Sequence, residues 1–153
     1  MNAGAGRRWL RLGSILGFLG VGFGAFGAHA LKTRLSPELL TIFETGVRYQ
    51  MYHALALLAL GLAAPRLGES STRRSGFSFT FGILIFSGTL YALALTGQRW
   101  LGALTPVGGL LLLFGWLNMA MAVGRHEPEG NCEVGRDARH NEERGPTPGA
   151  DPP

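Results

Sequence analysis

The chain has 153 residues, enough for one domain of ordinary size, and only 16% of them are charged. Its formal net charge is +4, but no basic helix face with interleaved aromatic residues accompanies that charge, which excludes nucleic acid from the expected partners. Three stretches contain no charged residue at all: 12–31, 76–98 and 101–124. Each matches a bilayer core of roughly 30 Å at about 1.5 Å per helical residue. The composition therefore predicts an all-α integral membrane protein.

The first predicted span, 10–31, carries glycines that recur at spacings of four, three, four and three residues. On a helix these positions fall within an arc of about 80° and form one seam. In lipid, small residues on a seam allow two helix backbones to approach closely. We therefore predict that helix packing involves Gly13, Gly17, Gly20, Gly24 and Gly27.

The end of this span also matches two other motifs. Gly22-x-Gly24-x-x-Gly27 has the spacing of a dinucleotide-binding loop, but no strand precedes it and no βαβ pattern surrounds it. Ala28-His29-Ala30 resembles a signal-peptide cleavage site. The uncharged run before it is longer than a signal's apolar region, and three further spans follow, so a retained first span is favoured over cleavage.

The second predicted helix begins outside the bilayer. Ser36 is expected to cap it, Pro37 suits its first position, and Glu38 complements the helix dipole. We predict an interfacial helix over 37–46 that leads into a span over 47–64. Glu44 and Arg48 lie four residues apart, in the favourable order for an ion pair.

Polar side chains enter the membrane on this second helix. Tyr49, Gln50 and His53 gather on one helix face, and Tyr91 lies on the third span. Polar residues inside a membrane usually face the bundle interior and need partners there. These four residues form the predicted polar cluster, and its candidate extensions are His29, Glu44 and Arg48.

The third and fourth spans are predicted over 76–96 and 104–124. Gly88 and Ala92 form a small-xxx-small pair, for which we predict helix packing. Thr105 is expected to cap the fourth helix, with Pro106 at its first helical position. Trp9 and Trp100 are expected to anchor the bundle at the membrane surfaces.

Residues 1–124 thus form the predicted four-helix transmembrane domain, and 125–153 form a tail without apolar periodicity. The tail is rich in proline, glycine and charge, so we predict that it is disordered and cytoplasmic. Its lone cysteine, Cys132, has no disulfide partner. A metal site formed by Cys132 with His126 or His140 would lack the ligand spacing of a zinc motif.

Orientation follows from the placement of basic residues. One side of a four-span topology holds seven arginines near the spans, and the other side holds four basic residues: Lys32, Arg34, Arg48 and Arg99. The positive-inside rule then predicts both termini in the cytoplasm of a multi-pass protein, which we expect in the plasma (inner) membrane.

Four segments in order, GAFGAHALK at 24–32, FETGVRYQMYHALALLAL at 43–60, FSGTLYALALTG at 86–97 and LTPVGG at 104–109, carry a family resemblance. The chain resembles the transmembrane protein 256 and domain-of-unknown-function 423 family of small four-span membrane proteins. The resemblance covers roughly residues 10–124 and implies four membrane helices. It implies no activity.

No nucleophile with a base, HExxH motif or carboxylate pair occurs within the spans, so we predict no enzymatic activity, cofactor or metal. The polar cluster suits hydrogen bonding between helices. An alternative is a site for a small solute, ion or proton with His53 as the titrating group, and a haem or metal held by His29 and His53 is a third. The lead hypothesis is a structural or complex-organising membrane protein. The rival is a transporter or channel that acts as an oligomer. The expected partners are the bilayer and a second copy or another membrane protein.

Overall fold

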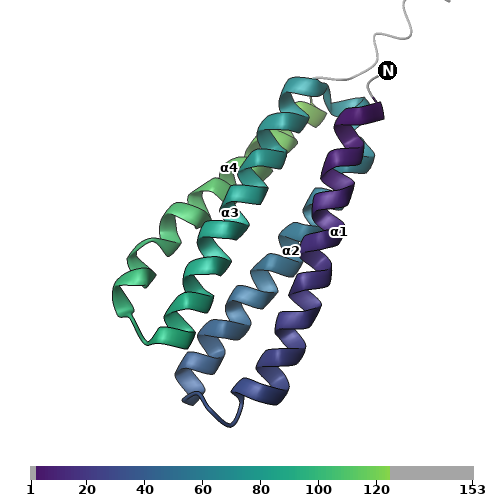
Figure 1. The fold of residues 1–153 in the computed structure, drawn as a ribbon. Helices are drawn as coiled ribbons and strands as arrows, with labels where there is room; N and C mark the ends of the chain where they lie inside the picture. The colour runs from purple at the N-terminus through teal and green to yellow at the C-terminus, as the bar shows by residue number, and fades with distance from the viewer. Residues whose placement is uncertain (1–2, 125–153) are drawn as a thin grey trace, which may run out of the picture.

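The computed structural model describes residues 3–124, and the predicted tail at 125–153 lies outside them. The described residues form four α-helices and no strand: α1 (Ala3–Phe26), α2 (Pro37–Leu67), α3 (Glu69–Thr96) and α4 (Thr105–Val123). A π-helical turn, η1 (Gly27–Leu31), extends α1, and a 3-10 turn, η2 (Arg99–Ala103), precedes α4. The helices form two antiparallel hairpins, α1–α2 and α3–α4 (Figure 1).

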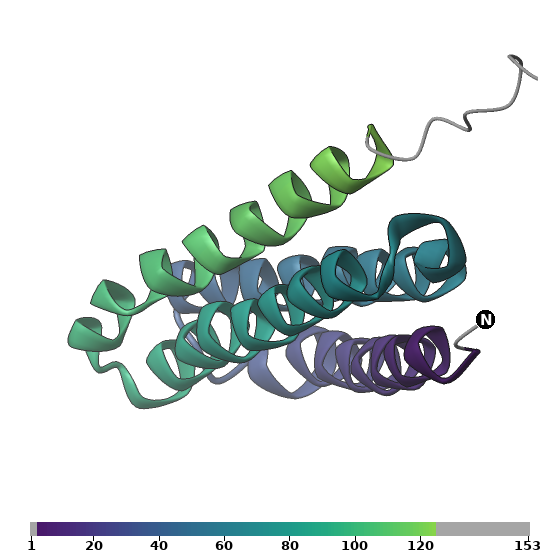
Figure 2. The same cartoon turned by 90° about the horizontal axis from the view of Figure 1, so that it is seen from above.

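The helices pack side by side in chain order. α2 lies between α1 and α3, and α3 lies between α2 and α4. Seen from above, α4 diverges from the other three helices toward its C-terminal end (Figure 2). α4 therefore relies on α3 for most of its packing and has only a minor contact with α2.

Within residues 3–124, three segments are long and apolar enough to cross a membrane: Gly6–Leu31, Glu69–Thr96 and Arg99–Val123. α2 is less apolar because it carries Gln50 and His53 near its middle, together with four charged residues. It nevertheless packs along both α1 and α3, which are themselves apolar enough to span. The predicted all-α membrane bundle is confirmed.

The start of α2 agrees with the sequence. The backbone N–H of Leu39 donates to Ser36 Oγ at 3.4 Å, and Pro37 occupies the first helical position. The Glu38 carboxylate accepts hydrogen bonds from a backbone N–H at Glu38 and from the Ser36 hydroxyl. These bonds lower the pKa of Glu38, and the backbone bond has the larger effect. The predicted interfacial helix and the span after it form one continuous helix of 31 residues.

A single residue, Gly68, separates α2 from α3. Its φ of 74° is readily adopted by glycine, and it reverses the chain without a loop. The Thr72 hydroxyl then donates to the Gly68 carbonyl at 2.8 Å. As a result α3 begins about two turns before the predicted span, and Arg73 and Arg74 lie on a helix.

Two expectations about single side chains were wrong. Trp9 is only 1% exposed, because Gly76 leaves space for its indole, and its ring packs edge-on to Phe77 at 5.4 Å. It is a core residue and not a surface anchor. Thr105 does not cap α4: it lies within the helix, and its hydroxyl pairs with that of Thr89 at 3.0 Å.

The glycine seam of α1 faces α2 along its length. A Cβ at Gly13 would lie 2.8 Å from the Ala54 carbonyl oxygen, and one at Gly20 would lie 2.6 Å from Met51 Sδ. The two helices are less tightly packed at the other three seam positions. A Cβ there would lie 3.1 to 4.0 Å from the nearest atom of α2, at Gly17, Gly24 and Gly27. The seam therefore lies in the close interface of α1 with α2, and that interface is tighter still at Gly6, outside the predicted seam, where a Cβ would lie 2.5 Å from the Gly61 carbonyl oxygen.

The pair predicted on α3 behaves differently. A Cβ at Gly88 would meet nothing within 4 Å, so this glycine does not bring another helix of the described chain into contact. Gly88 and Ala92 instead line an open apolar groove between α3 and the start of α4. The predicted helix packing at this pair is not made within residues 3–124.

Candidate functional site

The polar side chains of the bundle centre on Gln50 of α2, which is 3% exposed. Its Nε2 donates to the Leu16 carbonyl oxygen of α1 at 2.8 Å. Its Oε1 accepts from the Tyr91 hydroxyl of α3 at 2.9 Å. One amide group therefore joins three helices. Gly20 lies beside this amide: a Cβ there would be in ordinary contact with Gln50 Nε2, at 3.5 Å.

The Tyr91 ring lies in a pocket formed by aromatic rings and a glycine. The rings of Phe43 and Phe23 lie 4.8 Å and 5.1 Å from it, centroid to centroid. On the α2 side, a Cβ at Gly46 would come within 2.8 Å of the Tyr91 ring. The packing holds the phenol in place, so its hydroxyl is aimed at Gln50.

His53, one turn further along α2, is 6% exposed and bonds at both ring nitrogens. The Trp116 indole N–H of α4 donates to His53 Nε2 at 3.2 Å. Because an indole nitrogen can only donate, Nε2 must accept, which assigns the ring proton to Nδ1. Nδ1 then donates to the Tyr49 carbonyl oxygen at 2.8 Å. His53 is thus a neutral bridge between α2 and α4.

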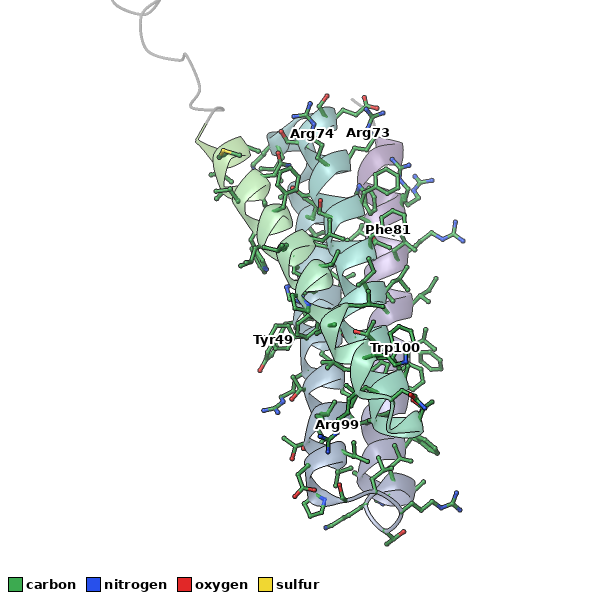
Figure 3. All side chains as sticks on the ribbon, turned by 90° about the vertical axis from the view of Figure 1, so that its left-hand side faces the viewer. Tyr49, Arg73, Arg74, Phe81, Arg99 and Trp100 are labelled. Atoms are coloured by element: carbon green, nitrogen blue, oxygen red, sulfur yellow. The ribbon has the colours of Figure 1, made fainter. Side chains whose placement is uncertain are left out.

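Tyr49 does not join Gln50. Its side chain is 40% exposed and stacks on Phe86 of α3, with the ring centroids 4.4 Å apart. Figure 3 shows it projecting from the side of the bundle. Of the four residues in the predicted cluster, Gln50 and Tyr91 are bonded directly, His53 faces α4, and Tyr49 contributes only its backbone carbonyl to the hydrogen bonds.

The candidate extensions of the cluster lie elsewhere. His29 is exposed on η1, and Glu44 and Arg48 are exposed on α2. No ion pair forms between Glu44 and Arg48. The Arg48 guanidinium instead donates to the Thr45 hydroxyl at 3.3 Å. These three residues do not reach the Gln50 and His53 bonds.

Two polar contacts of α4 were not predicted. Trp116 lies inside the uncharged stretch 101–124, and nothing in its sequence position points to His53. Asn118 is 7% exposed, and its Nδ2 donates to Ser75 Oγ at 2.8 Å and to the Ser71 carbonyl oxygen at 3.0 Å. The contact of Asn118 could have been predicted, because an amide in an otherwise apolar helix needs a hydrogen-bond partner within the membrane.

The arrangement offers hydrogen bonds between helices. Within residues 3–124 no three His, Cys, Asp or Glu side chains lie close enough to hold a metal ion. Both nitrogens of His53 are occupied by protein atoms, so neither is free to ligate haem or metal beside His29. The weaker metal candidates in the tail, Cys132, His126 and His140, lie outside the described residues.

Comparison with known proteins places this bundle among membrane proteins. The profile of the family described as "Protein of unknown function (DUF423)" matches residues 23–109. The UPF0382 membrane protein of Staphylococcus epidermidis is 47% identical over 113 residues, which cover 72% of this chain and 90% of the relative. The UPF0382 membrane protein YwdK of Bacillus subtilis is 40% identical over 116 residues, covering 75% of this chain and 94% of the relative. No solved structure matches the chain significantly.

Proposed function

The chain belongs to the DUF423 family of proteins of unknown function, and we propose that it acts as a non-catalytic structural protein of the membrane that organises a larger complex or the surrounding lipid. The proposal rests on one observation: the buried polar side chains of Gln50 and His53 form hydrogen bonds with other parts of the protein. Gln50 bonds α1 and α3, and His53 bonds α4 through Nε2 and the Tyr49 carbonyl of its own helix through Nδ1. Every polar side-chain atom of these two residues bonds a protein atom, and the side chains are buried away from any substrate.

Such bonds suit a role in fixing helix positions. In lipid, helices lack a hydrophobic force that would hold them together, and a hydrogen bond between them contributes about 0.6 kcal/mol on average. The bonds at Gln50, His53 and Asn118 involve all four α-helices. Together they support a bundle with one defined geometry, which a structural role requires.

The outer surface supports the same proposal. The exposed large side chains are apolar on α1 from Ile15 onward and along α4, among them Ile15, Phe18, Val21, Leu110, Leu113 and Leu117. This surface suits contact with acyl chains or with the helices of a second copy or another membrane protein.

The rival function is transport of a small solute, ion or proton by an oligomer, with His53 as the titrating group. Purified protein in liposomes that carry a pH dye and a cation dye separates the two. We expect dye signals equal to those of protein-free liposomes at every protein density. Flux that rises with density and falls in His53→Ala would overturn the structural proposal.

Assembly in the native membrane provides the complementary measurement. Extraction in mild detergent followed by native gel electrophoresis should place the chain in a discrete band larger than a monomer. The band should survive dilution of the extract. A chain that migrates only as a monomer, with cross-linking in intact membranes giving no larger species, would contradict an organising role.

A further inference from the structure

A cavity of about 250 Å³ lies between the end of α1 with η1 and the first half of α2, away from the Gln50 and His53 bonds. It is lined by Gly24, Gly27, Phe43, Glu44, Val47 and Arg48. The cavity exists because the α1 wall has no side chains. A Cβ at Gly24 would lie 3.4 Å from Val47 Cγ1, and one at Gly27 would lie 3.1 Å from the Phe43 ring.

Two opposite charges, Glu44 and Arg48, border this apolar cavity. Both are exposed and lie one helical turn apart, yet no ion pair joins them. Arg48 bonds only the neutral Thr45 hydroxyl, at 3.3 Å, which leaves most of its five N–H donors unused. Among the described residues nothing pairs with the Glu44 carboxylate. A carboxylate and a guanidinium therefore line the cavity, and both have hydrogen-bonding positions available for a ligand.

The position along α2 indicates the surroundings of this pair. Arg48 is the last charged residue before the uncharged stretch 49–65, and Gly27 is five residues from Lys32, or about 7 Å along a helix. The cavity thus opens where the bundle leaves the hydrocarbon for the headgroup region. Charged side chains at this depth bind partners, because leaving them unpaired near lipid is costly.

We propose that the cavity binds a phosphoethanolamine group, the headgroup of a zwitterionic phospholipid with a primary ammonium. Arg48 binds the phosphate, for which its planar guanidinium is well suited. Glu44 accepts hydrogen bonds from the ammonium. The apolar part of the lipid lies against Phe43, Val47 and the glycine wall of α1.

The lining distinguishes this group from other headgroups. A choline headgroup has no N–H to donate to Glu44, and quaternary ammonium groups are usually held in cages of several aromatic rings, whereas the cavity offers only Phe43. A purely anionic headgroup would bind Arg48 but would be repelled by the Glu44 carboxylate. The pair therefore favours a ligand that carries both charges.

The test uses the full-length protein in nanodiscs made from equal parts of phosphatidylethanolamine, phosphatidylcholine and phosphatidylglycerol. Native mass spectrometry of the released protein reports which lipid is retained. We expect phosphatidylethanolamine to be enriched over both others. Glu44→Gln and Arg48→Gln should each reduce that enrichment about tenfold, since each removes a charge-assisted hydrogen bond. Glu44→Gln should also raise retention of phosphatidylglycerol.

Matched controls are Glu38→Gln and Arg34→Gln, which remove exposed charges at the same end of the bundle but outside the cavity. Both should retain wild-type enrichment. Equal retention of phosphatidylcholine, or equal losses in the controls, would overturn the proposal. Competition by soluble glycerophosphoethanolamine would support the same chemistry with a free ligand, and enrichment without such competition would support a lipid. The melting curves of all variants should match, so this test can fail without affecting the structural role proposed from Gln50 and His53.

Discussion

At the scale of single residues, Gln50 is the most consequential side chain of the bundle. It meets α1 through a backbone carbonyl and α3 through a phenol, and it is almost fully buried. A buried polar group that loses its partner costs more than the bond itself contributes, because the remaining group stays desolvated. Gln50 therefore affects the packing of α2 against both α1 and α3.

Replacing Gln50 by leucine tests this. Gln50→Leu leaves the Tyr91 hydroxyl and the Leu16 carbonyl without their partner, and we expect a loss of about 1 to 3 kcal/mol of unfolding free energy. Thermal unfolding in mild detergent measures it. In the double variant Gln50→Leu with Tyr91→Phe, the loss should be smaller than the sum of the two single losses. Strict additivity would contradict a direct bond.

The bond between Trp116 and His53 gives a second residue-scale prediction. Trp116→Phe keeps an aromatic ring but removes the N–H donor, so it should lower stability by about 0.5 to 1.5 kcal/mol. The control is Trp100→Phe, because Trp100 is 63% exposed on η2 and should be insensitive. Equal melting temperatures for the two variants would mean that the indole bond contributes nothing to helix α4.

At the scale of elements, the pairing of α1 with α2 depends on the glycine seam. Gly13→Ala would bring a methyl group to 2.8 Å from the Ala54 carbonyl oxygen and 3.0 Å from the Leu58 side chain. The helices must then separate, with an expected cost of about 1 to 3 kcal/mol. Thermal unfolding in the same detergent reports the change.

The control for the seam lies on the same helix. A Cβ at Gly22 would meet nothing within 4 Å. Gly22→Ala should therefore leave stability unchanged, or raise it by up to about 1 kcal/mol through helix propensity. If Gly13→Ala and Gly22→Ala lower the stability equally, the contact of Gly13 with α2 does not explain the loss.

Only part of this helix packing could be predicted from the sequence. The seam on α1 could be predicted because the phase of five glycines depends only on helix geometry. Its partner could not, since the spacing of glycines says nothing about which helix packs on them. Trp116 and His53 are 63 residues apart in sequence. Their bond depends on how α4 crosses α2, which no local pattern encodes.

The helix ends divide in the same way. Ser36 and Pro37 marked the start of α2 because capping is local chemistry. The direct turn at Gly68 was missed, since a glycine before several polar residues is equally typical of a loop. Gln50 was assigned to the cluster from its helix face and Tyr91 from its place in the third span. The side chain of Tyr49 was placed with them although it lies on Phe86.

At the scale of the whole molecule, the charges are divided between two ends. Arg73 and Arg74 lie at the end where α2 meets α3, and Arg99 lies at the opposite end (Figure 3). Four antiparallel helices that all cross would leave the N-terminus, the α2–α3 turn and the tail on one side of the membrane. The arginine-rich end then predicts that this side is the cytoplasm.

The lone cysteine, Cys132, makes the orientation testable without a tag. In intact spheroplasts a membrane-impermeant maleimide should leave Cys132 unlabelled, and it should label Cys132 fully in inside-out vesicles. In Cys132→Ser with Thr33→Cys, the pattern should reverse, because residue 33 lies in the connection between η1 and α2 and is exposed. Labelling of both positions from the same side would mean that an even number of helices cross between them. Three crossings separate the two positions when α2, α3 and α4 all span, so opposite sides are required. Labelling of both from one side would therefore contradict a topology in which all three helices cross, and α2 is the one of the three that is not among the segments apolar enough to span.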